Sequence, residues 1–242
     1  MSKTPEMTRK DMKEPDQFQQ VAGEAASWLT GHRNQSLLVA GTVAAVVLVV
    51  GVVTGLRERS AEKVGGLLSA VYQAAGGTVS AIPLPGQDGP TFPTEAARQK
   101  AVIEAAGKVI AEASGSRQAA LASLAKGDAH YRLGEWDAAA TAYQAYLAGA
   151  DKGDAFRFGA LEGLALVEEA KGSSEGALAG WSRLATELPG FADRADLERA
   201  RLLAASGKAA EAKKLLAGFA EAHKGSALAS EATARLGKLG GP

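Results

Sequence analysis

The chain of 242 residues contains no cysteine, and this absence excludes several kinds of chemistry. Without thiols there are no disulfides, no thiolate nucleophile, no thiolate metal ligands and no lipoprotein cysteine. Aromatic residues are also scarce, at 5% of the chain, whereas alanine is abundant. Because sheet proteins favour aromatic and β-branched residues, this composition predicts closely packed helices rather than a sheet.

The sequence also lacks an excess of either charge and any catalytic motif. Lys+Arg and Asp+Glu both total 27, and no polybasic patch is present that would bind nucleic acid. His32, His130 and His223 are far apart and have no metal-binding spacing, and neither a phosphate-binding loop nor a nucleophile turn occurs. We therefore expect a binding protein with no enzyme activity, metal or cofactor. A membrane-tethered enzyme is the alternative of a different class, although no site for one was found.

One long apolar run divides the chain. Residues 37–56, LLVAGTVAAVVLVVGVVTGL, include no charged side chain. A helix of 20 residues spans about 30 Å, the thickness of the bilayer hydrocarbon. The run is too long for a cleaved signal peptide and lacks a cleavage site, so it predicts an uncleaved signal anchor. The alternative is a buried helix of a soluble domain, but nothing else in the chain is apolar enough to surround it.

The residues before this run predict a polar tail, residues 1–36, that is partly disordered. Residues 17–30 have apolar side chains at helical spacing, which indicates an amphipathic helix with Trp28 near the membrane interface, or a plain solvated helix. The basic residues flanking the run do not orient it, because the two sides are nearly balanced when the whole tail is included.

Small residues line one face of the predicted span. Gly51 and Gly55 form a small-xxx-small pair that would let two helices approach closely, as in a homodimer or in docking onto another membrane protein. Glycine is also frequent in membrane helices in general, and this alternative stays open.

The region 57–113 follows the span. Apolar spacing from Val64 predicts that the helix continues to Ala75, where Gly76-Gly77 stops it. The four prolines and two glycines of residues 78–93 predict a segment without regular structure, either a connector or a recognition loop. Thr94 then caps a helix that extends to about Ala113.

Residues 114–242 contain three similar segments, each predicted to be a pair of antiparallel helices. In each, a turn glycine is followed five residues later by an alanine, and four residues beyond by a bulky side chain. The three sets are Gly134, Ala139 and Tyr143; Gly172, Ala177 and Trp181; Gly207, Ala212 and Leu216. The glycine permits a tight turn, the alanine lets the helices cross closely, and the bulky residue fills the space toward the next pair.

This pattern resembles the tetratricopeptide repeat over about half of the chain, with glycine steps of 38 and 35 residues (134 to 172 to 207) against a family period of about 34. Pro189 stands where the closing proline of the family is expected. The chain departs from the family where His130, Glu168 and Leu203 replace a tyrosine and Tyr146 replaces a small residue. The resemblance implies an all-α fold, a tetratricopeptide-like α-solenoid, and residues 227–239 predict its C-terminal capping helix.

In this repeat family the first helix of each pair lines a protein-binding groove. The resemblance places seven residues there: Asp128, Tyr131, Arg132, Glu162, Glu169, Arg194 and Arg201. Mixed charge beside an aromatic ring suits a peptide or an extended protein segment. An ordinary solvated surface is the alternative for each residue.

The order of tail, anchor, helix, connector and repeats resembles the YfgM-like ancillary subunits of the SecYEG translocon. That resemblance implies an inner-membrane protein with a cytoplasmic tail and a periplasmic repeat domain. It further implies an adaptor or chaperone-like role beside the translocon and periplasmic chaperones. The alternative is a scaffold for another envelope assembly or division complex.

Overall fold

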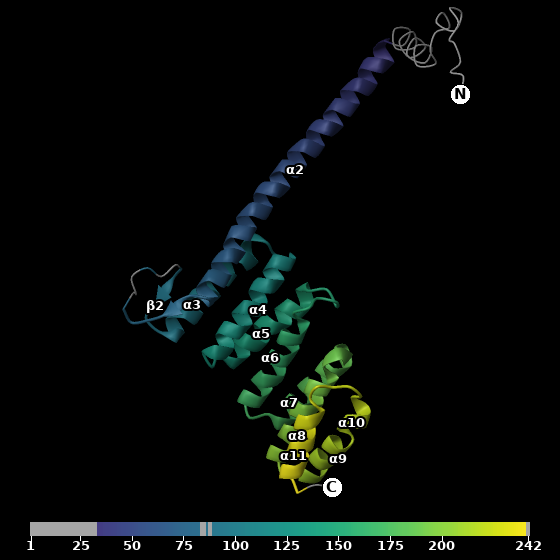
Figure 1. The fold of residues 1–242 in the computed structure, drawn as a ribbon. Coiled ribbons are helices and arrows are strands. Elements are labelled where there is room, and N and C mark those ends of the chain that lie inside the picture. The colour runs from purple at the N-terminus through teal and green to yellow at the C-terminus, as the bar shows by residue number, and fades with distance from the viewer. Residues whose placement is uncertain (1–32, 83–85, 87–88, 241–242) are drawn as a thin grey trace, which may run out of the picture. The chain divides into compact units, whose positions relative to one another are not determined.

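The computed structural model describes residues 33–82, 86 and 89–240, and the side chains of residues 33–41, 43, 44, 57 and 58 lie outside that set. The chain divides into two compact units, residues 1–60 and 61–242. The described part is mostly helical, as the predicted all-α class requires (Figure 1). The helices are α2 (Arg33–Ala75), α3 (Glu95–Glu112), α4 (Arg117–Arg132), α5 (Trp136–Gly149), α6 (Arg157–Ala170), α7 (Ser174–Glu187), α8 (Ala192–Ala205), α9 (Ala209–Ala217), α10 (Phe219–Ala222) and α11 (Ala229–Lys238), with a 3-10 turn at Pro189–Phe191.

Helix α2 contains the apolar run. Its large apolar side chains between Val46 and Leu56 are each 40–67% exposed. Among the residues described, no helix is both long enough and apolar enough to cross a membrane. The predicted span over 37–56 includes side chains outside the described set, and the predicted amphipathic helix at 17–30 lies wholly outside it. Both therefore stay predictions.

Within the second unit, residues 61–75 of α2 pair with α3 as an antiparallel helical hairpin that the sequence reasoning did not find. Lys63 near the start of this stretch forms an ion pair with Glu112 at the end of α3, with 2.6 Å between Nζ and Oε1. At the opposite end, Arg98 donates to the Gly77 carbonyl over 3.2 Å. Buried apolar residues of the two helices share one core: Val64, Val71, Ala74, Val102, Ala106 and Val109. The end of α2 at Ala75 confirms the predicted helix end.

The segment 78–93 contains regular structure, contrary to the prediction from its prolines and glycines. Strand β1 (Thr78–Val79) pairs in parallel with β2 (Thr91–Phe92). The N–H of Thr78 donates to the carbonyl of Pro90 over 3.0 Å. Proline has no backbone N–H to donate, but its carbonyl can still accept, so Pro90 is compatible with this pairing. The prediction was wrong because the strands consist of β-branched and aromatic residues at the two ends of the segment, outside its proline-rich middle.

The three predicted hairpins are α4–α5, α6–α7 and α8–α9, and their turns confirm the role of glycine. Gly134, Gly172 and Gly207 have φ angles of 76, 79 and 78°, a left-handed region that side chains with a Cβ disfavour. In each turn the N–H after the glycine donates to the carbonyl five residues earlier, as in a Schellman motif. Ala139, Ala177 and Ala212 are fully buried, and Tyr143, Trp181 and Leu216 are at most 4% exposed.

Consecutive helices from α3 to α9 pack against one another in chain order (Figure 1), and α4 also contacts α6. The capping helix predicted at 227–239 is observed as α11, which packs against α9. Thr94 caps α3 as predicted, since its hydroxyl accepts from the Ala97 N–H over 3.1 Å. This arrangement of neighbouring helices is compatible with an α-solenoid.

Candidate binding surface

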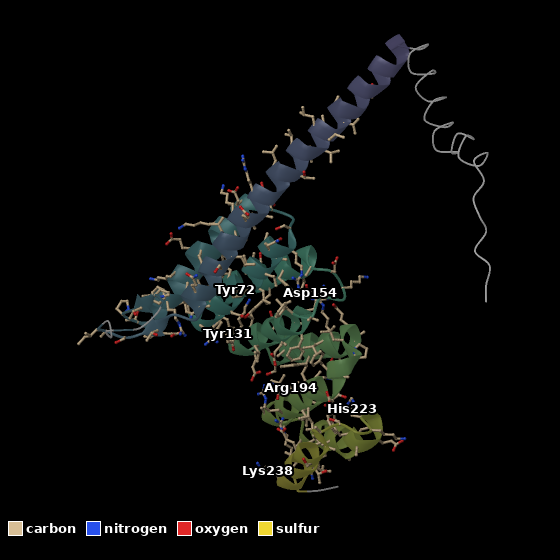
Figure 2. All side chains as sticks on the ribbon, turned by 45° about the horizontal axis from the view of Figure 1, so that its top comes forward. Tyr72, Tyr131, Asp154, Arg194, His223 and Lys238 are labelled. Atoms are coloured by element: carbon tan, nitrogen blue, oxygen red, sulfur yellow. The ribbon has the colours of Figure 1, made fainter. Side chains whose placement is uncertain are left out.

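The seven predicted groove residues lie on the first helix of each hairpin. Asp128, Tyr131 and Arg132 belong to α4, and the other four belong to α6 and α8. All seven are exposed or half-buried. Figure 2 labels Tyr131 and Arg194, together with Lys238 in the capping helix. The structure therefore leaves this face of the hairpins accessible.

Four of the seven residues meet in ion pairs between α6 and α8. Glu162 accepts from Arg194 over 3.3 Å. Glu169 accepts from both terminal nitrogens of Arg201, each over 2.7 Å, in a bidentate arrangement. Because these side chains are partly exposed, each pair stabilises the fold by about 1 kcal/mol at most. The pairs tie the second hairpin to the third and neutralise their own charges.

The same row of charges continues beyond the predicted residues. Arg201 also pairs with Glu198 over 2.7 Å, and Glu198 lies 3.8 Å from Arg235 of α11. Arg235 in turn pairs with Glu231 over 2.6 Å. Sequence reasoning missed Glu231 and Arg235 because α11 follows an irregular segment that breaks the repeat spacing, and it did not include Glu198 of α8. The available signal was opposite charge at helical spacing, three residues apart for Glu198 and Arg201 and four apart for Glu231 and Arg235.

The pKa values of the carboxyl groups differ along this row. Hydrogen bonds from Arg201 lower the pKa of Glu169, and the same pairing raises the pKa of Arg201. Desolvation raises the pKa of Glu162, and the nearby charges of Glu198 and Asp128 add to that effect against the opposing charge of Arg194. Glu169 therefore stays charged to a lower pH than Glu162 does.

The predicted residues of α4, unlike those of α6 and α8, form no ion pairs among the described residues. The hydroxyl of Tyr143 donates to Asp128 over 2.8 Å, although desolvation still raises the pKa of that exposed aspartate. The ring of Tyr131 lies against Trp136 with 5.2 Å between centroids. Within the described residues, Arg132 has no hydrogen bond or ion pair. Tyr131 and Arg132 therefore remain available to a partner, one as an aromatic surface and the other as a cation.

A hollow of about 300 Å³ lies between α8, α9 and α11. Its floor is apolar, formed by Ala200, Ala204, Leu216 and Leu239, and its rim carries Arg201, Arg235 and Lys238. Lys238 is exposed and has no ion pair among the described residues. An apolar side chain with a neighbouring carboxylate would fit this hollow.

Each histidine in the described part of the chain contacts one carboxylate. The His130 ring contacts Glu135 and the His223 ring contacts Asp196, over 2.5 and 2.9 Å. His32 lies outside the described residues. No three His, Cys, Asp or Glu side chains are grouped to hold a metal ion within the described residues.

The glycine pair of the predicted span lies in α2. Gly51 is exposed and Gly55 half-buried, and a Cβ added to either would meet no atom of the described residues within 4 Å. The intervening Thr54 hydroxyl donates to the carbonyls of Val50 and Gly51 over 2.9 and 3.0 Å, which satisfies it within the helix. A helix contact at this pair stays a prediction.

Comparisons with known proteins found neither a family model nor a curated protein that matches this chain.

Proposed function

We propose that this chain is a single-pass membrane protein whose repeat domain binds other proteins through the face formed by α4, α6 and α8. The observation that carries the proposal is the common register of three hairpins, with left-handed glycine turns, buried alanines and bulky side chains at matching positions. Such stacked hairpins present a long surface built from the first helix of each pair, which suits an extended protein segment.

The membrane anchor is supported by the uncharged run over 37–56 and by its exposed apolar residues from Val46 to Leu56. Apolar side chains in such number on one helix need a lipid or protein environment. The Gly51/Gly55 pair supports a homodimer or a contact with another membrane protein at this level.

The order of parts supports a narrower proposal, an adaptor or chaperone-like accessory subunit of the Sec translocon. By resemblance to the YfgM-like subunits, the tail 1–36 is cytoplasmic and the tetratricopeptide-like domain periplasmic. The partners would be translocon subunits and periplasmic chaperones. The row of paired charges, the exposed part of the Tyr131 ring and the Arg132 guanidinium are the contacts we expect a protein partner to use.

Affinity capture of the full chain from mild detergent tests the partner. We expect translocon and chaperone proteins to be enriched over a mock capture, and a Tyr131→Ala/Arg132→Glu variant to lose them. Lys208→Glu is a matched control, because Lys208 is exposed in a turn outside this face. Recovery of a different envelope assembly or division complex would contradict the translocon assignment and support a scaffold instead.

A reporter fused after Pro242 tests the orientation separately. We expect it to be active outside the cytoplasm, and a signal confined to the cytoplasm would overturn the proposed topology.

A further inference from the structure

Three furrows occur at equivalent positions of the three hairpins. The first helix of each hairpin forms the floor of its furrow, and the second helix forms one wall. The first two furrows are also lined by residues of the preceding helix. The floor residues are Ser123, Lys126 and His130; Leu161, Leu164 and Glu168; Asp196, Arg199 and Leu203. These sets are separated by the same steps as the turn glycines, 38 and 35 residues (123 to 161 to 196).

The furrows lie on the opposite side of the hairpins from the proposed groove. At about 100° per residue, the floor residues Lys126 and His130 point roughly 160° away from Asp128 and Arg132 around α4. The same separation holds on α8 between Arg199 and Arg201. A partner in a furrow would therefore leave the groove face free.

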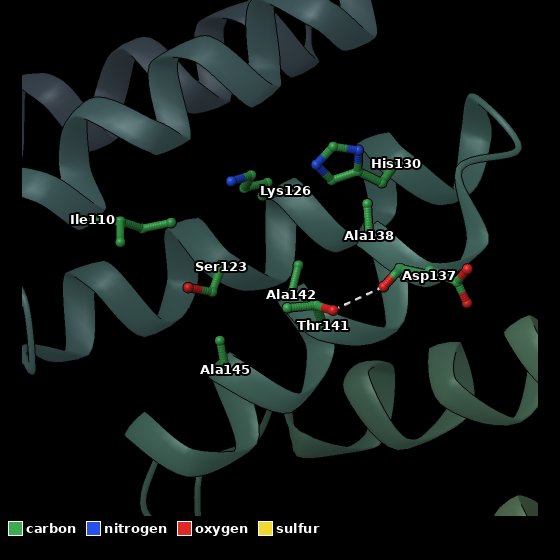
Figure 3. Close-up of a pocket in the computed structure, with 9 residues that line it drawn as sticks. All are labelled: Ile110, Ser123, Lys126, His130, Asp137, Ala138, Thr141, Ala142 and Ala145. Atoms are coloured by element: carbon green, nitrogen blue, oxygen red, sulfur yellow. Dashed lines mark hydrogen bonds between the residues drawn. The ribbon is translucent and has the colours of Figure 1, made fainter.

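The first furrow has the most apolar lining of the three and is as large as the third. Its volume is about 440 Å³, against about 190 and 420 Å³ for the second and third. One wall includes Ala138, Ala142 and Ala145, at helical spacing along α5 beside Asp137 and Thr141, and Ile110 of α3 also lines the furrow (Figure 3). The third furrow has Glu211, Lys214 and Leu215 where the first has Ala138, Thr141 and Ala142, so the side chains of its wall are larger and more charged.

The first furrow also contains an unpaired cation. In the third furrow Arg199 pairs with Asp196, one turn earlier, over 2.7 Å. In the first, Ser123 stands at the position of that aspartate and its hydroxyl donates to the Ala119 carbonyl over 2.9 Å. Lys126, at the position of Arg199, consequently has no hydrogen bond or ion pair among the described residues.

The other charged side chains of the first furrow are already paired. His130 contacts Glu135, and Asp137 accepts from Lys171 over 2.8 Å. The ammonium of Lys126 is thus the free charge that a ligand would meet there, and a carboxylate is its complement.

We propose that this first furrow docks an acidic helix of a partner protein, with small or aliphatic side chains against the alanines of α5 and a carboxylate on Lys126. A helix fits because α4 already lies along both α3 and α5, and a helix in the furrow would contact the same two neighbours from outside. The alanine wall lets the two backbones approach closely. This inference stands on the furrow alone and does not depend on the proposed function.

The test uses the full chain in detergent and a displayed library of helical peptides of about 16 residues, roughly 24 Å long. Aliphatic residues occupy one face of each peptide, and the flanking positions vary among Glu, Gln and Lys. We expect selected peptides to carry Glu at one flanking position. We also expect Lys126→Glu to weaken their binding at least about tenfold and to select Lys there instead.

Two further variants make the outcome specific. Ala145→Trp fills the furrow from an exposed position and should abolish binding, whereas Lys208→Glu makes the same charge change elsewhere and should leave binding unchanged. Circular dichroism checks that each variant is folded. Peptides of no preferred charge, peptides insensitive to Lys126→Glu, or no selected peptide at all would overturn the proposal. Self-association of the wild type that Ala145→Trp abolishes would assign the furrow to a second copy of this chain and would also overturn it.

Discussion

The first and second hairpins place different aromatic side chains, Tyr143 and Trp181, at the same buried position of the repeat. Tyr143 of α5 lies between two glycines: a Cβ on Gly127 would come within 2.7 Å of its ring, and one on Gly163 within 2.5 Å. Trp181 of α7 is instead surrounded by aliphatic side chains of α6, α7 and α8. The tyrosine therefore needs two glycines on neighbouring helices, whereas the tryptophan needs none at its own ring.

The polar atoms of the two rings are also treated differently. The Tyr143 hydroxyl donates to Asp128, but the buried indole N–H of Trp181 has no hydrogen-bond partner among the residues that the structure describes. The position shared by Tyr143 and Trp181 thus requires a large side chain. Whether the polar atom of that side chain has a hydrogen-bond partner depends on the residues around it. The first hairpin gains a specific contact from its aromatic residue, and the second gains mainly buried area.

The largest expected effect comes from removing the larger ring. Trp181→Ala should lower the free energy of unfolding by about 3–5 kcal/mol, because it leaves a cavity in a core where Trp181 is 1% exposed. Chemical denaturation followed by circular dichroism measures this loss. Phe156→Ala is the control: that ring is 49% exposed, and we expect a change within about 0.5 kcal/mol. Equal losses in the two variants would contradict the role of Trp181 as the centre of this core.

The second prediction concerns the glycines around Tyr143. Gly163→Ala should cost about 1–3 kcal/mol by overpacking the tyrosine ring. Gly159→Ala, on the same helix, is the matched control. A Cβ there meets no described atom within 4 Å, so we expect Gly159→Ala to stabilise the fold by up to about 1 kcal/mol.

A double-mutant cycle sharpens this result. In a Tyr143→Leu background, Gly163→Ala should cost less than in the wild type, because the smaller side chain leaves room for the methyl group. Additive costs would show that the close approach at Gly163 is not the cause.

A smaller effect is expected from the Tyr143 hydroxyl. Tyr143→Phe should cost about 0.5–1.5 kcal/mol, since it removes one hydrogen bond while exposed Asp128 remains open to water. Thermal denaturation in parallel with the wild type measures it. If Tyr143→Phe loses no stability, the Tyr143 hydroxyl contributes nothing to the free energy of unfolding, and the contrast with the unpaired indole N–H of Trp181 fails.

The smallest effects are pH-dependent and opposite in sign in the two hairpins. Hydrogen bonds from Arg183 and Arg157 lower the pKa of Glu187, so its contribution is present above the ordinary glutamate pKa and is lost as the pH falls through the lowered value. Desolvation by the helices packed around it raises the pKa of Asp128, although the residue is exposed, so its contribution is present below the ordinary aspartate pKa and is lost as the pH rises through the raised value.

Glu187→Gln and Asp128→Asn therefore form a pair. Relative to the wild type, the stability of Glu187→Gln should fall as the pH increases from acid to neutral, and that of Asp128→Asn should rise. Denaturation midpoints at several pH values measure both, and parallel trends in the two variants would contradict the assigned pKa directions.

Local features of the fold were predictable from short stretches of sequence. The glycine turns, the buried alanines at Ala139, Ala177 and Ala212, and the cap at Thr94 depend on residues within one turn or one hairpin. Steric limits on φ and the helical period act over such distances, so the printed sequence carries them directly.

The candidate site was only partly predictable. The repeat spacing placed seven residues on the correct helices, but it did not indicate that Glu169 and Arg201 would neutralise each other across 32 positions. It also missed Glu198, Arg235 and Glu231, and it gave no sign of the furrow that holds Lys126. These features depend on which helices lie side by side, and spacing within one hairpin does not specify this.

The sequence by itself determined the helices, their turns and the register of the three hairpins, because each rests on backbone conformations and side-chain sizes within a few residues. Only the tertiary structure decided the pairing of residues 61–75 with α3, the parallel strands β1 and β2, and the nesting of Tyr143 between Gly127 and Gly163. These contacts join residues separated by longer stretches of chain. They form because several helices must exclude water from a common core at once.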